Sequence, residues 1–413
     1  MLKIVKKIRN KLGKGFAFFY IWCIAKTRTK QNISNNKIAV IFNGHIGDAI
    51  LGHQALNALA DYYVSIGKDV YLLCEKSLWD VLRLCEPKPK VSFIDLSGLN
   101  TPDKGFSEIK RLSDSVKKLE FEKSIVIPNR NLPTHYIAAC ISDNEKWGFL
   151  DITMPTALNL RIKQKVLYKF YTDYVTVSPD IPYTESIRDV LMKLGVPYYK
   201  TKISYLPKQG ECKFMDRKKY ITVAVDSMAT ARRWCAEYFI DLIQRLINSY
   251  SYDIVLTGRT VPTSDNEKYR AAFASCSKVK NLIGKTGFME FIELIRGAEF
   301  HIGIDSGSIH VAASVGTQAF CLTGVWDGNR LFPYRVEEPA DNTADPICIY
   351  RKDTDIDQLF CRNCTACRGG YGINNQECYM LCKSGRPCLC LSKITPDDVM
   401  AAINHAREAG VIQ

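Results

Sequence analysis

The strongest constraint on the fold is a repeated alternation between short apolar runs and amphipathic segments, which begins at Lys37. The apolar runs read KIAVIF, DVYLLC, VSFIDL and KSIVIP. Amphipathic stretches, one ending near Tyr63 and one from Leu78 to Leu84, separate the first three runs. Apolar runs that alternate with helices are typical of a parallel sheet covered by helices on both faces. The segment 37–205 is therefore predicted to be a Rossmann-like α/β domain.

A second alternation follows a less periodic stretch at 151–212 and starts at the run KYITVAVD. It continues to the run TQAFCLTG and predicts a second Rossmann-like domain over 206–340. Two such domains in sequence are expected to face each other across a cleft between the carboxyl ends of their sheets, where α/β proteins bind ligands. The last segment, 394–413, is predicted to be a helix with Thr395 at its N-cap and Gly410 past its end.

Positive charge is concentrated near the start of the chain. The formal charge is +13, and residues 1–40 contain ten Lys and Arg but no Asp or Glu, which leaves 13 − 10 = +3 for the remainder. Nucleic-acid binding is disfavoured, because the body is nearly neutral and the centre of the basic tail is apolar and aromatic. Nine of the ten lie in a tail, residues 1–36, so most of the net charge belongs to this tail and not to the two domains.

The tail combines its cations with an apolar run from Phe16 to Ala25. This run is too short to span a bilayer, which needs about 20 apolar residues. Lys26, Arg28 and Lys30 follow at once and oppose translocation as a secretory signal. We expect an amphipathic anchor that lies on the cytoplasmic face of an anionic membrane. The alternative is a helix that packs on its own domain or on a partner subunit.

The sixteen cysteines fall into two groups. Nine are scattered singly through apolar contexts and are predicted to be buried, reduced thiols of a cytosolic protein. Seven lie between 361 and 390, in a cysteine-rich segment at 341–393, and the first two of these seven form the C-x2-C pair Cys361 and Cys364. This spacing is typical of tetrahedral metal sites. The spacing does not choose four ligands among the seven or zinc over iron, and reduced thiols in a loop are the alternative.

The stretch FHIGIDSGSIHVAASVGTQAF, residues 300–320, predicts a strand that runs into the turn 305–308, which contains Asp305, Ser306 and Gly307. A helix that contains His310 is predicted to follow directly. Backbone N–H groups at such a helix start bind anions, and a glycine lets a phosphate approach closely. The alternative is an ordinary turn with Ser308 as the N-cap.

The stretch AVDSMATARRWCAEYF, residues 224–239, leaves another predicted strand and carries Ser227, Thr230, Arg232 and Arg233. Neighbouring arginines can neutralise a diphosphate through bidentate hydrogen bonds, although solvated surface arginines are commoner. Two loops suited to phosphate within one domain favour a nucleotide ligand there.

The stretch NGHIGDAILGHQAL, residues 43–56, places Asp48 in the first turn of a predicted helix. A carboxylate at this position complements the helix dipole, a contribution of about 0.3–1 kcal/mol, or it acts as a base. His45 and His53 lie near it in sequence, and each is a candidate for contact with a substrate; the alternative is a packed or solvated histidine.

These three stretches resemble glycosyltransferase family 9, the heptosyltransferases of lipopolysaccharide core synthesis, which have the GT-B fold. The resemblance covers residues 37–340 in outline. It implies that Asp48 is the catalytic base and that Arg232 contacts the donor phosphates. Gly47 and His45 lie next to Asp48 in the sequence, and we expect them at the acceptor. Asp305, Ser306, Gly307 and His310 match the diphosphate-binding block, and Ser227 and Thr230 lie on the other donor loop. Two departures are the absence of a proline in the first helix and an arginine, Arg232, where the family has lysine.

The cysteine-rich segment resembles the cysteine finger of autotransporter heptosyltransferases, in which it holds iron. That likeness implies Cys361, Cys364, Cys378 and Cys390 as the metal ligands. No cofactor is expected for catalysis, and the metal would be a structural zinc or iron.

Taken together, the sequence predicts an inverting glycosyltransferase at the inner face of the cytoplasmic membrane. By resemblance, its donor is an ADP-linked heptose and its acceptor a growing surface glycan. One alternative keeps the fold but transfers a hexose or N-acetylhexosamine to a lipid-linked oligosaccharide or a protein. Another is a non-catalytic nucleotide-binding assembly subunit. The sequence does not determine the oligomeric state.

Overall fold

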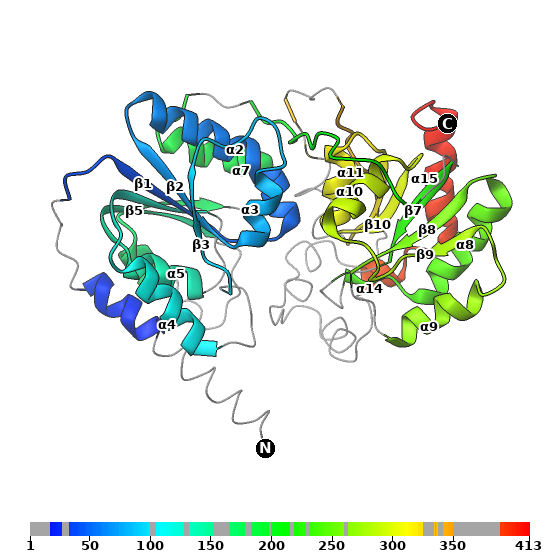
Figure 1. The fold of residues 1–413 in the computed structure, drawn as a ribbon, viewed down its shortest axis with the longest axis horizontal. Helices are drawn as coiled ribbons and strands as arrows, with labels where there is room; N and C mark the ends of the chain where they lie inside the picture. Colours follow the sequence, from blue (N-terminus) through cyan, green and yellow to red (C-terminus); the bar gives the residue numbers. More distant parts are fainter. Residues whose placement is uncertain are drawn as a thin grey trace, which may run out of the picture. The chain divides into compact units, whose positions relative to one another are not determined.

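The chain forms two compact α/β units (Figure 1). The computed structural model describes residues 17–26, 33–98, 105–127, 132–151, 165–177, 183–197, 200–214, 219–225, 227, 232–259, 263–324, 334, 336–337, 342–350 and 389–413. The first unit comprises Met1–Ile181 and Glu185–Lys200, and the second comprises Pro182–Thr184 and Thr201–Gln413.

The sheet of the first unit has six strands in the order β3-β2-β1-β4-β5-β6, and every neighbouring pair is parallel. In this sheet Ile41 of β1 is in register with Leu73 of β2 and Val126 of β4. The strands are β1 (Lys37–Phe42), β2 (Asp69–Cys74), β3 (Ser92–Asp95), β4 (Glu120–Ile127), β5 (Ser142–Asp151) and β6 (Asp173–Val177). The parallel sheet predicted from the apolar runs is confirmed.

The apolar pattern does not predict strand β5, because this strand carries charged residues inside the sheet. Lys146 and Asp143 form an ion pair with an Nζ–Oδ2 distance of 2.6 Å, and both side chains are buried. The Lys146 ammonium also donates to the carbonyl of Ile141, and the Ser124 hydroxyl donates to Asp143. Because these polar groups satisfy one another, a polar sequence forms an interior strand.

Helices cover both faces of this sheet (Figure 1). Figure 1 shows α2 and α7 on one face and α4 and α5 on the other. The helices are α2 (Ile46–Ser65), α3 (Lys76–Leu82), α4 (Gly105–Val116), α5 (Leu132–Cys140) and α7 (Tyr183–Lys193), with further helical residues at 17–26 and 165–170. Cover on both faces explains why β1 is buried from its second residue to its last.

The helix at 17–26 packs on the first unit, as one of the two interpretations of the tail predicts. Ala17 and Ile21 are buried in a core cluster that also contains Leu112 of α4 and Ala139 of α5. Among the described residues, no helix is long and apolar enough to cross a membrane.

The sheet of the second unit also has six parallel strands, in the order β12-β11-β10-β7-β8-β9. The strands are β7 (Tyr220–Ala224), β8 (Asp253–Thr257), β9 (Val279–Asn281), β10 (His301–Ile304), β11 (Ala319–Leu322) and β12 (Ile347–Ile349). Strands β7 and β10 are neighbours in the sheet, although 76 residues lie between the end of β7 at Ala224 and the start of β10 at His301. The two loops predicted to suit phosphate therefore leave adjacent strands at the same edge.

The helices of the second unit are α8 (Ala236–Ser249), α9 (Thr263–Ala272), α10 (Phe288–Arg296), α11 (Gly307–Ser314), α14 (Leu389–Ser392) and α15 (Pro396–Glu408). Ile221 of β7 packs in one core cluster with Phe239 of α8 and Ile403 of α15. Tyr220, the preceding residue, packs in another cluster with Leu294 of α10. Successive residues of a strand point to opposite faces, so α8 and α15 cover one face of the sheet and α10 covers the other.

The predicted ends of the last helix are confirmed. The Thr395 side chain accepts a hydrogen bond from the N–H of Asp398, and the Asp398 carboxylate accepts the N–H of Thr395 at 2.7 Å. At the other end Gly410 has a φ of 70°, and the N–H of Val411 reaches the carbonyl of Ala406. A glycine in the left-handed region is a common helix stop because it has no β-carbon to strain.

Candidate active site

In the first unit, the turn after β1 folds the Asp48 side chain back onto the start of α2. The Oδ2 atom of Asp48 accepts the backbone N–H of His45 at 2.8 Å. A β-carbon added to Gly44 would lie 2.7 Å from the β-carbon of Asp48. Position 44 therefore needs glycine because any side chain would push the carboxylate away. Asp48 is half-buried, and its Oδ1 atom makes no hydrogen bond with a described residue.

The same edge of the sheet is tied together by Asn43. Its Nδ2 atom donates to the Thr134 hydroxyl of α5 at 2.7 Å, and its N–H donates to the carbonyl of Ile127 at the end of β4. Both side chains are buried. This bridge fixes the start of the Asp48 turn against β4 and α5, and the sequence alone does not reveal it because 91 residues separate the partners.

The two histidines near Asp48 differ in their surroundings. His45 is exposed and precedes α2, whereas His53 is fully buried within it. Burial lowers the pKa of His53 to about 4, and Asn57 lies 3.3 Å from its Nε2 atom. Of the two interpretations of His53, the structure supports the packed histidine. Gly47, in the first turn of α2, is buried.

In the second unit, α11 begins directly after β10, as the sequence predicts. The N-cap is Ser306, so the alternative that placed Ser308 there is wrong by two residues. The hydroxyls of Ser306 and Ser308 lie 3.0 Å apart. Helix α11 therefore starts with Gly307, which has no side chain, beside two hydroxyl groups. This arrangement has the features of an anion site at a helix start.

Arg232 and Asp305 connect the two loops that leave β7 and β10. The Nη1 atom of Arg232 lies 2.9 Å from Oδ2 of Asp305, whose side chain is only 3% exposed, against 24% for the arginine. The buried carboxylate orients the guanidinium and balances part of its charge. Arg233 has a different role, since its Nε atom donates to the carbonyl of the buried Ser227 at 2.8 Å. Thr230 lies outside the described residues.

Tyr334 is a site residue that sequence reasoning missed. Its hydroxyl lies 2.7 Å from Nδ1 of His310, and the two buried rings stack with centroids 5.7 Å apart. Its carbonyl accepts the hydroxyl of Thr184. Burial raises the pKa of Tyr334 well above its usual value, so the hydroxyl keeps its proton and forms a hydrogen bond with Nδ1. In the tautomer in which the hydroxyl is the donor, His310 carries its own proton on Nε2.

The described cysteines are free thiols. Of the nine scattered ones, Cys74, Cys85, Cys140 and Cys321 are buried and the other five are half-buried, so the prediction of buried thiols is only partly confirmed. Burial raises the pKa of Cys74 and Cys85 to about 12.

Of the predicted metal ligands, Cys361, Cys364 and Cys378 lie outside the described residues. Cys390 lies in α14 and is buried in the core of the second unit. Within the described ranges there is no group of three or more side chains that could hold a metal ion.

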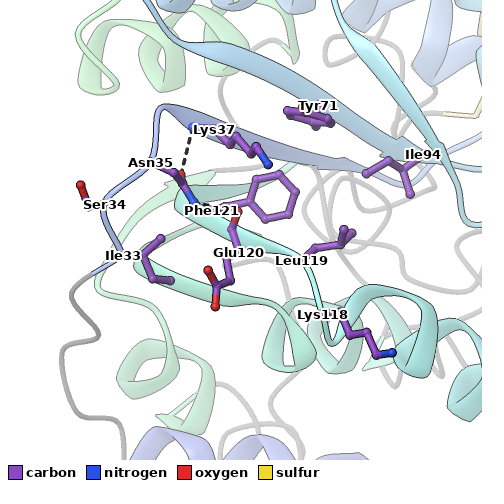
Figure 2. A pocket seen from close by; sticks show the side chains of 10 residues that line it. All are labelled: Ile33, Ser34, Asn35, Lys37, Tyr71, Ile94, Lys118, Leu119, Glu120 and Phe121. Atoms are coloured by element: carbon purple, nitrogen blue, oxygen red, sulfur yellow. Dashed lines mark hydrogen bonds between the residues drawn. The ribbon is translucent and has the colours of Figure 1, made fainter.

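Figure 2 shows a cavity of about 440 Å³ in the first unit. It is lined in part by Lys37 and Glu120, the first residues of β1 and β4, and by Tyr71 and Phe121. Asp48 follows the opposite, carboxyl end of β1. The cavity therefore lies at the other edge of the sheet and is not part of the candidate active site.

The sequence and the structure of the chain were compared with those of known proteins. Residues 132–340, half of the chain, match the sequence model of glycosyltransferase family 9 (heptosyltransferase). No curated protein sequence matches.

Three solved structures are similar at low identity. A family 9 glycosyltransferase of Veillonella parvula has 17% identity and a TM-score of 0.60, and the match covers 91% of this chain and 98% of that one. The ADP-heptose lipopolysaccharide heptosyltransferase II of E. coli has 16% identity, coverage of 91% and 99%, and a TM-score of 0.57. The E. coli heptosyltransferase WaaC, solved with ADP, has 16% identity, coverage of 89% and 99%, and a TM-score of 0.54. These likenesses confirm the predicted GT-B-like fold.

Proposed function

Because the chain belongs to glycosyltransferase family 9, the heptosyltransferase family, we propose that it transfers a heptose from an ADP-linked donor to a lipopolysaccharide-type or other cell-surface glycan, with inversion at the anomeric carbon. The enzyme would work at the inner face of the cytoplasmic membrane. The observation that carries the proposal is the Arg232–Asp305 pair beside the start of α11, because it brings a cation, hydroxyl groups and helix N–H groups to one edge of the second unit.

We assign the diphosphate of the donor to this edge. Arg232, oriented by Asp305, would bind phosphate oxygens through its guanidinium, and the start of α11 would supply N–H donors at Gly307. His310 would add an Nε2–H donor. These groups match the charge that accumulates on the leaving group as the glycosidic bond breaks, which is the charge that an enzyme must stabilise. Ser227 and Thr230 belong to the same proposed site.

The nucleotide is assigned to ADP by likeness. Of the solved relatives, heptosyltransferase II is described as an ADP-heptose enzyme, and WaaC was solved with ADP. Both share the fold of this chain at low identity. The arginine at 232, where the family has lysine, keeps the positive charge but has a planar fork. A comparison of nucleotides and of donor sugars tests both the heptose and the adenine of the proposed donor.

We assign activation of the acceptor to Asp48 in the first unit. Its Oδ2 atom is held by the N–H of His45, which leaves Oδ1 to take a proton from the acceptor hydroxyl. The acceptor oxygen then bonds to the anomeric carbon, the bond from that carbon to the diphosphate breaks, and its electron pair leaves with ADP. Attack opposite the leaving group inverts the configuration. His45, exposed next to this carboxylate, and Gly47 would lie at the acceptor.

The donor assignment is tested with the purified full chain. ADP should raise the melting temperature more than UDP or GDP at equal concentration, because a ligand that binds only the folded state stabilises it. With ADP-heptose, mass spectrometry should detect either transfer to a glycan acceptor or slow release of heptose to water. A larger shift with UDP or GDP would favour a hexose or N-acetylhexosamine donor. No shift with any of them would contradict the donor site.

A structural zinc or iron held by Cys361, Cys364, Cys378 and Cys390 is a separate proposal. Its support is the C-x2-C spacing and the burial of Cys390 in α14, which would attach the metal to the core of the second unit. Purified, reduced protein should contain about one metal ion per chain. Cys361→Ser should lower the metal content, whereas Cys276→Ser, outside the cluster, should not. Absence of zinc and iron by elemental analysis would end this proposal.

A further inference from the structure

The helix at residues 17–26 has one face that packs on the first unit. Ala17 and Ile21 are buried, and Ile24 is partly buried, against the cluster formed with α4 and α5. Tyr20 meets Tyr136 of α5 edge to face, with centroids 5.3 Å apart. These positions follow the three- and four-residue spacing of one helix face. The helix is therefore docked on the domain and is not a free tail.

The other face of this helix carries an exposed aromatic pair. Phe19 is 58% exposed and Trp22 is 36% exposed, and their rings stack with centroids 5.7 Å apart and planes 26° apart. The Lys26 ammonium lies 4.0 Å from the centroid of the Trp22 ring. Aromatic rings flanked by a lysine are typical of segments that sit at the boundary between water and lipid.

The charge near the exposed face with Phe19 and Trp22 indicates what kind of surface binds there. Residues 1–30 contain nine Lys and Arg and no Asp or Glu, so an anionic surface is attracted to the region that contains the aromatic pair. A second copy of the chain would bring the same nine cations against the first, and the remainder of each chain is also slightly positive. Self-association through this face is therefore opposed by charge, whereas a bilayer of acidic phospholipids is favoured.

We propose that the docked helix is a fixed membrane-docking surface, with Phe19 and Trp22 inserted at the boundary of an anionic bilayer. Because Ala17 and Ile21 belong to the core cluster, moving the helix away from α4 and α5 would expose apolar side chains to water. The helix therefore binds the membrane without leaving the domain. The first unit is then held against the lipid in one orientation, unlike a domain on a flexible tether.

Co-sedimentation with vesicles tests this proposal and needs no sugar substrate, so its outcome is independent of the proposed transfer reaction. Full-length protein should bind vesicles that contain phosphatidylglycerol and leave neutral phosphatidylcholine vesicles largely unbound. The double variant Phe19→Ser, Trp22→Ser should reduce partitioning into the anionic vesicles by roughly tenfold or more, since two aromatic side chains no longer leave water. Its melting temperature should change little, because neither side chain belongs to the core cluster that holds the helix on the domain. Met192→Ser, which removes a half-exposed apolar side chain of α7, is the matched control and should bind like the wild type.

Two further measurements examine the insertion and the docked state. Trp22 fluorescence should shift to shorter wavelength with anionic vesicles, and Trp22→Phe should lose that change while it still binds. Hydrogen exchange should show that α5 keeps its protection when vesicles bind, because the helix stays in place.

Three results would overturn the proposal. They are equal vesicle binding by the wild type and the double variant, loss of protection in α5 upon binding, and a wild-type dimer that the double variant converts to monomer without any vesicle binding. The last result would assign the face to a second copy of the chain.

Discussion

Replacing Gly44 with alanine tests whether the turn before α2 holds the Asp48 carboxylate in place. The added β-carbon would lie 2.7 Å from the β-carbon of Asp48 and 2.9 Å from its Oδ2 atom. Carbon atoms in good contact lie about 3.5–4.0 Å apart, so Asp48 must move by most of an ångström. That movement breaks or lengthens the 2.8 Å hydrogen bond from the N–H of His45.

Two effects set the size of the expected change. Overpacking of this kind costs about 1–3 kcal/mol, and the hydrogen bond to the carboxylate adds on the order of 1 kcal/mol. We expect Gly44→Ala to lower the free energy of unfolding by about 2–4 kcal/mol. Displacement of the proposed base by about an ångström should also slow sugar transfer by roughly tenfold to a hundredfold.

The assay combines chemical denaturation, hydrogen exchange in the first turn of α2, and a double-mutant cycle. Asp48→Gly removes the clashing β-carbon, so Gly44→Ala should have little effect on stability in that background. Gly210→Ala is the matched control, because an added β-carbon there meets nothing within 4 Å. A Gly44→Ala protein with wild-type exchange and wild-type transfer would refute the reasoning.

Three further predictions concern other parts of the chain. Tyr334→Phe keeps the ring stacked on His310 but removes the hydroxyl that contacts Nδ1. The ADP affinity measured by calorimetry should therefore fall by about three- to tenfold. An unchanged affinity would exclude the idea that the Tyr334 hydroxyl positions His310 for the diphosphate. Arg232→Ala should weaken ADP binding by about tenfold or more, because the variant lacks the guanidinium proposed to bind the diphosphate; an ADP affinity equal to that of the wild type would place the diphosphate elsewhere. Burial lowers the folded-state pKa of His53 to about 4, so as the pH falls the unfolded chain binds a proton at this histidine before the folded chain does. The contribution of His53 to the free energy of unfolding should therefore be complete above about pH 6.5 and should decrease as the pH drops toward 4. Chemical denaturation at several pH values checks this, and His53→Gln should reduce the dependence of the free energy of unfolding on pH.

The sequence predicts both sheets because buried parallel strands are continuous apolar runs. It predicts the position of the turns after β1, β7 and β10 for the same reason, since each turn directly follows such a run. Strand β5 escapes prediction because its buried Lys146 and Asp143 neutralise each other. Such a pairing is a property of the folded chain and leaves no periodic signal.

The candidate site is only partly predictable for a related reason. Its loops are local in sequence, but the contacts that orient them are not. Tyr334 meets His310 from 24 residues away, and Asn43 meets Thr134 from 91 residues away. The docked helix shows a different limit, because an apolar stripe suits a protein core and a membrane equally well. At 17–26 the buried Ile21 and the exposed Trp22 show that adjacent positions face different surroundings.

The central claim is that Asp48 is the base of a glycosyl transfer, and Asp48→Asn tests it most directly. Turnover of ADP-heptose with a glycan acceptor should fall by about 10²–10⁴-fold, while ADP affinity by calorimetry and the melting temperature should hardly change, because the amide oxygen can still accept the N–H of His45. Asp61→Asn, an exposed carboxylate on the same helix, should retain wild-type turnover. A folded Asp48→Asn enzyme that transfers sugar at a rate near that of the wild type would contradict the account.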